Sequence, residues 1–371
     1  MALLSVDELS ITFTGRGRRD IKAVSGVSFD VDQGQVVGLV GESGCGKSVT
    51  SLALMGLLPD RGVRLGGRAE FDGGDLLTMS QSRLRDLRGS QIAMIFQDPL
   101  SSLNPVVPIG VQVTEILSRH RGLKGAAARK EAAHLLDRVG IPDPTRRLKE
   151  YPHQLSGGMR QRALIAMAVA CAPRLLIADE PTTALDVTIQ AQILELLKEL
   201  VDEEGTALLM ITHDLGVVAG LCDEVNVLYA GKVVESAGRR ALFEAPTHPY
   251  AHGLLGSIPR LDAPRGEPLK PIRGSINDRI DWADGCAFAP RCDSYTLECL
   301  SGAVELTEPR EPAHHVRCVN PVLPAADVVG ADVADADVAD AADAAGADVA
   351  DAADVASESP VAAAKKTEAP S

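Results

Sequence analysis

The chain has 371 residues, of which 45% are hydrophobic and only 3% aromatic, and its formal net charge is −14. This length allows one full-sized domain with appendages or two modest domains. A core poor in aromatic rings must be built from Val, Ile, Leu and Ala, which suits a parallel sheet with helices on both faces. The acidic balance excludes the basic surface of a nucleic-acid-binding protein, so we expect no nucleic acid partner.

Residues 1–40 have the pattern of β-strands. Apolar and polar residues alternate over Leu9–Phe13 and Val24–Val31, and the apolar run Val36–Val40 follows a turn. These segments predict antiparallel strands that lead into one buried strand. Four further apolar runs, separated in part by helical patterns, predict βαβ units and a mostly parallel sheet. They are Ile92–Phe96, Leu175–Ala178, Ala207–Thr212 and Val225–Leu228.

A glycine-rich segment, Gly41-Glu-Ser-Gly-Cys-Gly-Lys-Ser48, lies between the apolar strand and a helical pattern over Val49–Leu58. It matches the phosphate-binding P-loop, in which glycines allow backbone amides to surround a phosphate, Lys47 adds charge and Ser48 offers its hydroxyl to Mg²⁺. A glycine-rich turn with an incidental Lys-Ser is the alternative. A nucleophile elbow is disfavoured because its last glycine is missing. The candidate nucleotide-binding residues are Gly41, Glu42, Ser43, Gly44, Cys45, Gly46, Lys47, Ser48 and Val49.

Two adjacent carboxylates, Asp179 and Glu180, close the apolar run Leu175–Ala178. Two such groups repel each other and are costly to bury, and a Mg²⁺ ion bound by Asp179 relieves that cost. Glu180 can then activate a water molecule for attack on a terminal phosphate. Taken alone, the pair is more often a solvated strand end. Beside a P-loop it predicts a catalytic centre.

The segment Leu155-Ser-Gly-Gly-Met-Arg-Gln-Arg162, between the P-loop and the carboxylates, resembles the signature motif of ATP-binding-cassette (ABC) ATPases. The resemblance covers about residues 1–240. It implies an α/β P-loop NTPase cassette with a mostly parallel sheet, an antiparallel β subdomain and a helical subdomain inserted over about 98–161. At the signature, Ser156, Gly157 and Gly158 can form a second anion site at a helix N-terminus.

The resemblance also assigns roles to single residues. Gln97 matches the family glutamine that contacts Mg²⁺ and the attacking water, and His213 matches the histidine that contacts the γ-phosphate. Asp186 belongs to the segment that resembles the D-loop, and it is also a good N-cap for a helix that Gly205 stops. Phe13 is the nearest candidate for stacking on adenine, with a plain core role as the alternative. Outside this context, a Gln or His at a strand end is usually a core or surface residue.

The resemblance implies partners as well. In this family the signature of one cassette completes the ATP site of another, in a head-to-tail dimer. The chain holds one cassette and no apolar segment long enough for a membrane span. We therefore expect a second ABC ATPase subunit and two transmembrane permease subunits. No targeting segment is visible, so the expected location is the cytoplasmic face of the membrane.

Residues 241–323 form a Pro-rich, irregular extension that holds four of the seven cysteines. A segment with little core of its own needs a cross-link to be stable, so a bound Zn²⁺ ion or [4Fe–4S] cluster is favoured over four unrelated thiols. No Cys-x-x-Cys pair is present, which weakens the zinc hypothesis. We call these residues the four extension cysteines: Cys286, Cys292, Cys299 and Cys318.

Within the extension, His248-Pro-Tyr250 and Gly285-Cys-Ala-Phe-Ala-Pro-Arg-Cys292 resemble the C-terminal region of oligopeptide/dipeptide importer ATPases. This resemblance implies ATP-driven peptide uptake by a D-type subunit that pairs with an F-type ATPase, together with an extracytoplasmic binding protein. Some members carry a [4Fe–4S] cluster here, and the chemistry of four thiolate ligands favours that cluster over Zn²⁺. Uptake of nickel or another small solute, and a soluble non-transport ABC ATPase, are the alternatives.

Residues 325–371 hold 11 acidic side chains and two lysines among many Ala and Val residues. This composition predicts a disordered, solvated tail over 324–371, with a helix docked on the body as the alternative.

Overall fold

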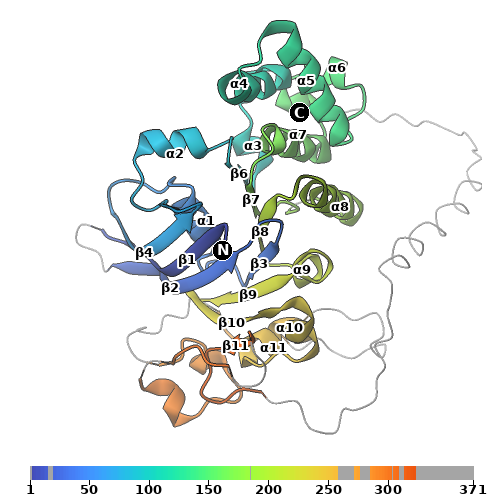
Figure 1. Ribbon diagram of the computed structural model, residues 1–371. Helices are drawn as coiled ribbons and strands as arrows, with labels where there is room; N and C mark the ends of the chain where they lie inside the picture. Colours follow the sequence, from blue (N-terminus) through green and yellow to red (C-terminus); the bar gives the residue numbers. More distant parts are fainter. Residues whose placement is uncertain are drawn as a thin grey trace, which may run out of the picture. The chain divides into compact units, whose positions relative to one another are not determined.

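The computed structural model describes residues 2–15, 20–183, 185–257, 271–275, 285–302, 304–308 and 313–322. All elements named below lie in these ranges (Figure 1). The acidic tail predicted over 324–371 lies outside the described residues. In the described part of the chain, no helix combines the length and apolar character that crossing a bilayer requires.

The N-terminal residues form most of an antiparallel sheet with the strand order β2-β1-β4-β5. Its strands are β1 (Leu4–Phe13), β2 (Ile21–Val31), β4 (Val63–Phe71) and β5 (Gly74–Asp75). Leu9, Ile11 and Val27 are buried on its inner face, as the alternation of apolar residues requires. The predicted antiparallel strands are confirmed, whereas β4 and β5 have no counterpart in the sequence prediction.

A second sheet has seven strands in the order β11-β10-β9-β3-β8-β7-β6. The five strands from β9 to β6 run parallel, and β10 and β11 add antiparallel pairs at one edge. This arrangement confirms the predicted α/β fold. The bounds are β3 (Val36–Val40), β6 (Ile92–Ile95), β7 (Leu175–Asp179), β8 (Ala207–Thr212), β9 (Glu224–Tyr229), β10 (Lys232–Gly238) and β11 (His315–Val316).

Both faces of this parallel sheet are covered, which explains its unbroken apolar runs. Along β3, Val36 and Val40 join one hydrophobic core with α8 and α9, while Val37 and Leu39 join a second core with α1 and the antiparallel sheet. The helices outside the 98–161 region are α1 (Lys47–Leu54), α2 (Gln81–Leu87), α8 (Val187–Glu204), α9 (Leu215–Leu221), α10 (Arg239–Glu244) and α11 (Pro249–Gly256).

Residues 98–161 are mainly helical, and their helices lie together beyond β6 (Figure 1). Val113, Leu117 and Leu135 from two of them are buried in the first core. The elements are α3 (Pro99–Ser102), α4 (Ile109–Arg121), α5 (Gly125–Arg138), α6 (Pro144–Arg147), the 3₁₀ turn η1 (Pro152–Gln154) and α7 (Gly157–Val169), which runs past the predicted limit.

The extension is attached to the sheet through β11, which pairs with β10. Glu235 of β10 is fully buried, and its carboxylate accepts hydrogen bonds from the backbone amides of Thr247 and His248 at 2.7 and 2.8 Å. His314, just before β11, lies 2.7 Å from the same carboxylate. Two further 3₁₀ turns, η2 (Ala289–Arg291) and η3 (Leu297–Leu300), hold the region that carries most of the extension cysteines.

Candidate nucleotide-binding site

The P-loop connects β3 to α1, as its sequence context predicts. Two of its glycines leave no room for a side chain. A Cβ atom on Gly41 would lie 2.2 Å from the carbonyl oxygen of Leu228, and one on Gly46 would lie 2.7 Å from that of Ala23. Gly46 also caps α1 with a φ of 110°. The glycines therefore let the loop pass tightly between the ends of β9 and β2 before the helix begins.

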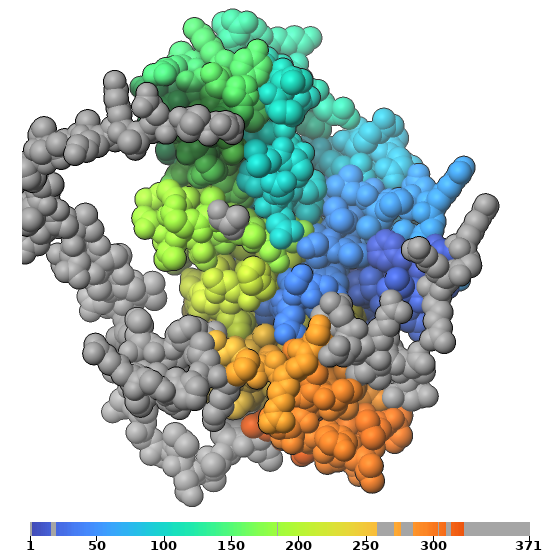
Figure 2. All heavy atoms as spheres, turned by 180° about the vertical axis from the view of Figure 1, so that it is seen from behind, coloured from blue at the N-terminus to red at the C-terminus, as the bar shows by residue number. Residues whose placement is uncertain are grey.

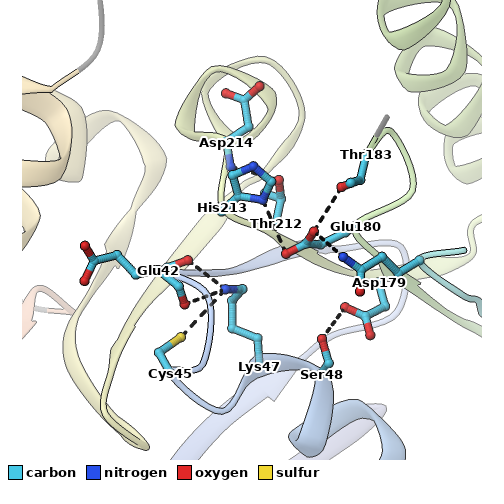
Figure 3. Close-up of polar contacts among 12 residues, drawn as sticks. Glu42, Cys45, Lys47, Ser48, Asp179, Glu180, Thr183, Thr212, His213 and Asp214 are labelled. Atoms are coloured by element: carbon cyan, nitrogen blue, oxygen red, sulfur yellow. Dashed lines mark hydrogen bonds and ion pairs between the residues drawn. The ribbon is translucent and has the colours of Figure 1, made fainter. Parts of the chain in front are cut away.

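Lys47 is buried and turns back into the loop (Figure 3). Its Nζ donates to the carbonyl oxygens of Gly41 at 2.7 Å and Glu42 at 3.0 Å, and it lies 3.7 Å from the Cys45 sulfur. An ammonium group held by neutral carbonyls gains more from a phosphate, because hydrogen bonds between two charged groups are stronger. This geometry suits a lysine that exchanges loop carbonyls for the phosphates of a nucleotide.

Ser48 and Asp179 meet at the point where the sequence predicts Mg²⁺. The Ser48 hydroxyl donates to Asp179 Oδ1 at 3.0 Å. Asp179 is buried at the end of β7, and burial raises the pKa of its carboxyl group, with a smaller contribution from the charge of Glu180. A hydroxyl and a carboxylate are hard oxygen ligands of the kind that Mg²⁺ combines with phosphate oxygens and water. These two residues therefore fit the ion.

Glu180 is held by three neighbouring side chains (Figure 3). Its Oε2 accepts hydrogen bonds from Gln97 Nε2 and from the Thr183 hydroxyl, both at 2.9 Å, and its Oε1 lies 3.3 Å from His213 Nδ1. The backbone of Glu180 is left-handed, with a φ of 46°, and its amide donates to the Ile211 carbonyl. Strain of this kind is typical of functional sites, and here it directs the carboxylate off the strand end.

The structure thus brings together Glu180, which the strand-end carboxylates predict as the catalytic base, and Gln97 and His213, which the resemblance assigns to catalysis. Gln97 directs its amide nitrogen at Glu180, so in this arrangement it orients the carboxylate, and its predicted contact with Mg²⁺ stays a prediction. Thr183 is a further partner that the sequence prediction missed. Its position three residues after Glu180, at a turn, is the available signal, because a hydroxyl there can reach back to the carboxylate.

A cavity of about 620 Å³ joins these groups. Its lining comes from the start of the P-loop, from the three catalytic candidates and from the extension. The lining residues are Gly41, Glu42, Ser43, Gln97, Glu180, His213, Leu254, Gly274 and Ser275. The participation of the extension was not predicted, because no motif in residues 241–323 points to the P-loop.

The signature residues lie elsewhere in the chain. Ser156 caps α7 by accepting a hydrogen bond from the Met159 amide, and Ser156 and Gly157 are exposed. Asp186 caps α8 through the Ile189 amide at 2.9 Å. The Asp186 cap was predicted from the sequence, and the signature lies at a helix N-terminus as expected, but neither segment lines the cavity around Glu180.

Phe13 lies at the end of β1 and packs half-buried against the second hydrophobic core. This environment agrees with its alternative role as a core residue. The basic loop that follows it, over residues 16–19, lies outside the described residues. Stacking of Phe13 on adenine stays a prediction.

The four extension cysteines are neighbours but do not converge as a set of metal ligands. The Cys286 amide donates to the Cys299 carbonyl at 2.7 Å. Burial raises the pKa of the Cys318 thiol to about 11, with smaller contributions from the charges of the other three thiolates. Among the described residues, no three His, Cys, Asp or Glu side chains come close enough to hold a metal ion. A metal centre needs several ligands within about 2.0–2.4 Å of one ion, so the structure does not support the predicted [4Fe–4S] or Zn²⁺ site.

Comparison with known proteins agrees with this site. The family described as ABC transporter matches residues 24–183, and the family described as oligopeptide/dipeptide transporter, C-terminal region, matches residues 234–299. The dipeptide transport ATP-binding protein DppD of Bacillus subtilis is 53% identical over 298 residues, which cover 80% of this chain and 88% of that protein. The chain belongs to the ABC transporter family. It is an ATP-binding subunit of that family, and therefore an ATPase.

Other relatives of this ABC ATPase extend the likeness. The oligopeptide transport ATP-binding protein OppD of Escherichia coli is 49% identical over 321 residues, covering 86% of this chain and 94% of that protein. Among solved structures, a dimeric ATP-binding cassette in a post-hydrolysis state with ADP and phosphate bound has a TM-score of 0.58 and 28% identity. The alignment covers 64% of this chain and 99% of the chain in that structure. These likenesses confirm the cassette fold that the sequence predicts.

Proposed function

We propose that this ABC ATPase binds and hydrolyses ATP to energise peptide uptake through separate permease subunits. The observation that carries the proposal is the single cavity in which the P-loop faces Glu180, Gln97 and His213. The named relatives DppD and OppD transport dipeptides and oligopeptides, and the match of the extension to the oligopeptide/dipeptide C-terminal region supports the same solute class here.

The site residues divide the chemistry among them. Amides of the P-loop and the ammonium group of Lys47 bind the terminal phosphates. Ser48 and Asp179 hold Mg²⁺, which when bound neutralises phosphate charge and polarises the bond to be broken. Glu180 orients a water molecule and accepts its proton, while Gln97 fixes the carboxylate. His213 follows β8, its ring lies 3.3 Å from Glu180, and about half of its side chain is exposed, so it can donate a hydrogen bond to the γ-phosphate.

The same proposal covers the partners. We propose a head-to-tail dimer with a related F-type ATPase, in which the exposed Ser156 and Gly157 and the half-buried Gly158 of one subunit face the P-loop of the other. Two transmembrane permeases and an extracytoplasmic binding protein complete the importer. The ATPase is then a peripheral protein at the cytoplasmic face of the membrane. The relatives named as transport ATP-binding proteins support the permeases and the binding protein as partners.

Reconstitution tests the proposal. The chain is co-expressed with its genomic neighbours, purified with the permeases through a tag on this subunit, and placed in liposomes with the binding protein. We expect ATP hydrolysis that a dipeptide or oligopeptide stimulates, together with peptide uptake. Hydrolysis stimulated by nickel and not by peptides would contradict the peptide assignment. A chain that hydrolyses ATP but never associates with permeases would be a soluble ABC ATPase.

A further inference from the structure

The extension holds the second residue of the P-loop from two sides. Arg291, in η2, donates from Nη2 to Glu42 Oε1 at 2.9 Å and from Nη1 to Glu42 Oε2 at 2.5 Å. The Tyr250 hydroxyl, from α11, accepts a hydrogen bond from the Glu42 amide at 2.9 Å. Side chain and backbone of Glu42 are therefore both fixed by residues more than 200 positions away in sequence. In Figure 2 the orange extension adjoins the blue N-terminal segments on one face.

Arg291 is itself held in place before it reaches the P-loop. Its guanidinium group lies 5.7 Å from the ring centre of Tyr229 and 5.9 Å from that of Phe288, and only 5% of its side chain is exposed. The Tyr229, Tyr250 and Phe288 rings contact one another edge-on or tilted. A planar cation between aromatic rings has little freedom, so it presents both terminal nitrogens to the carboxylate in a fixed orientation.

The contact also bears on Lys47, through the backbone of Glu42. The Glu42 carbonyl accepts hydrogen bonds from Lys47 Nζ at 3.0 Å and from the Cys45 amide at 3.3 Å. A rotation of Glu42 would therefore move the lysine ammonium group and the turn that arranges the phosphate-binding amides. The Arg291–Glu42 pair restricts that rotation.

On its other side, Arg291 reaches the cavity wall. Its Nε donates to the Arg273 carbonyl at 2.7 Å, and the two residues that follow, Gly274 and Ser275, line the same cavity as Glu180. One buried side chain thus joins the P-loop to the part of the extension that borders the catalytic groups.

We propose that Arg291 is a positioning residue for ATP binding, which acts through Glu42 to hold the P-loop open to the nucleotide phosphates. The inference rests on the proposed ATPase function and adds the extension to the nucleotide site. Arg291 does not touch ATP; it sets the shape of the loop that does. Its loss should therefore change the affinity for ATP more than the rate of hydrolysis once ATP is bound.

The test compares Arg291→Met with the parent in the purified ATPase–permease complex. Methionine keeps an unbranched stem against the two rings but cannot bond to Glu42. We expect the KM and Kd for ATP to rise about tenfold, because a charge-assisted hydrogen bond is lost, while kcat at saturating ATP stays within about twofold. Arg291→Lys, which keeps the charge but not the paired geometry, should fall between the two.

Arg317→Met provides the matched control. Arg317 is also an arginine of the extension with hydrogen-bonded donors, but its guanidinium group donates to the carbonyls of Val233 and Val304 and not to a P-loop residue. It should lower the unfolding temperature without changing the KM for ATP. If Arg291 had a purely structural role, Arg291→Met would behave like Arg317→Met and lower the unfolding temperature without changing the KM for ATP.

A double-mutant cycle tests whether Arg291 affects ATP binding through its contact with Glu42. In a Glu42→Gln background, Arg291→Met should add less than about twofold to KM, because both changes break the same contact. Additive effects, or a wild-type KM in Arg291→Met, would overturn the inference. If Arg291→Met does not fold, Arg291→Lys and Glu42→Gln carry the same comparison. A parent complex that fails to bind ATP would instead refute the proposed function.

Discussion

Glu180→Gln is the substitution that tests the proposed chemistry most directly. Glutamine has nearly the shape of glutamate but cannot accept a proton. Gln97 and Thr183 both donate to Oε2, so the amide oxygen of the new side chain should take that position. Its NH₂ group then faces His213 Nδ1, which can accept a hydrogen bond when that nitrogen is unprotonated. We therefore expect the variant to fold and to bind ATP as the parent does.

The expected loss lies in the hydrolysis step. General-base assistance contributes about 10²–10⁴ in rate, which corresponds to about 3–5 kcal/mol of transition-state stabilisation. Phosphate contacts through the P-loop amides and Lys47 do not involve Glu180, so the affinity for ATP should change little. The complex should consequently accumulate with intact ATP bound, in the dimeric form.

The assay measures phosphate release at saturating ATP and, after gel filtration, the ATP-to-ADP ratio of the bound nucleotide. Glu244→Gln makes the same chemical change at an exposed residue of α10 paired with Arg240, and should leave both readouts unchanged. Phosphate release at the parent rate in Glu180→Gln would show that Glu180 is not the base. Loss of bound nucleotide would show that the carboxylate serves binding instead.

Two further predictions concern the phosphate and magnesium ligands. Lys47→Ala should weaken ATP binding about 10- to 150-fold, as the loss of about 1.5–3 kcal/mol implies, and unchanged affinity in a binding titration would contradict the P-loop assignment. Asp179→Asn should raise the unfolding temperature of the nucleotide-free protein at neutral pH, because burial raises the pKa of Asp179 and its ionised form then disfavours folding. That gain should shrink as the pH falls and vanish below the ordinary pKa of the carboxyl group, where the parent is protonated in both states. A gain independent of pH would refute this cause.

The strand ends were the most predictable part of the molecule. Periodicity placed buried strands before the P-loop, Gln97, Asp179 and His213, and parallel strands bring their carboxyl ends to one edge of a sheet. The helix that begins after Asp186 and ends before Gly205 also follows from local rules, since an N-cap side chain and a left-handed glycine act within one turn.

Contacts between distant segments were not predictable in the same way. Nothing near Arg291 in the sequence indicates that its partner is Glu42, because the contact depends on how the extension folds against β9 and β10. The pairing of β11 with β10 was missed for the same reason, since a two-residue strand has no periodicity to detect. Thr183 was missed because a single threonine in a turn has many ordinary roles.

The four extension cysteines show the limit of clustering in sequence as a guide to metal binding. Their clustering in a segment with little core of its own indicated a shared ion, yet their side chains in this structure do not form a ligand set. Metal analysis after anaerobic purification decides whether these cysteines bind a metal or are free thiols. Iron with acid-labile sulfide would restore the cluster hypothesis, zinc alone would favour the alternative, and neither metal would agree with the arrangement of the thiols.

The attachment of the extension to β10 has a consequence for truncated forms of the chain. Removing the residues from 313 onward would uncover hydrogen-bonding groups along β10 and turn it into the open edge of a seven-stranded sheet reduced to six. It would also remove His314, whose ring forms a hydrogen bond with the fully buried carboxylate of Glu235. Bare edges of this kind recruit strands from other molecules, so such a shortened ATPase should aggregate even though every residue that handles nucleotide is still present.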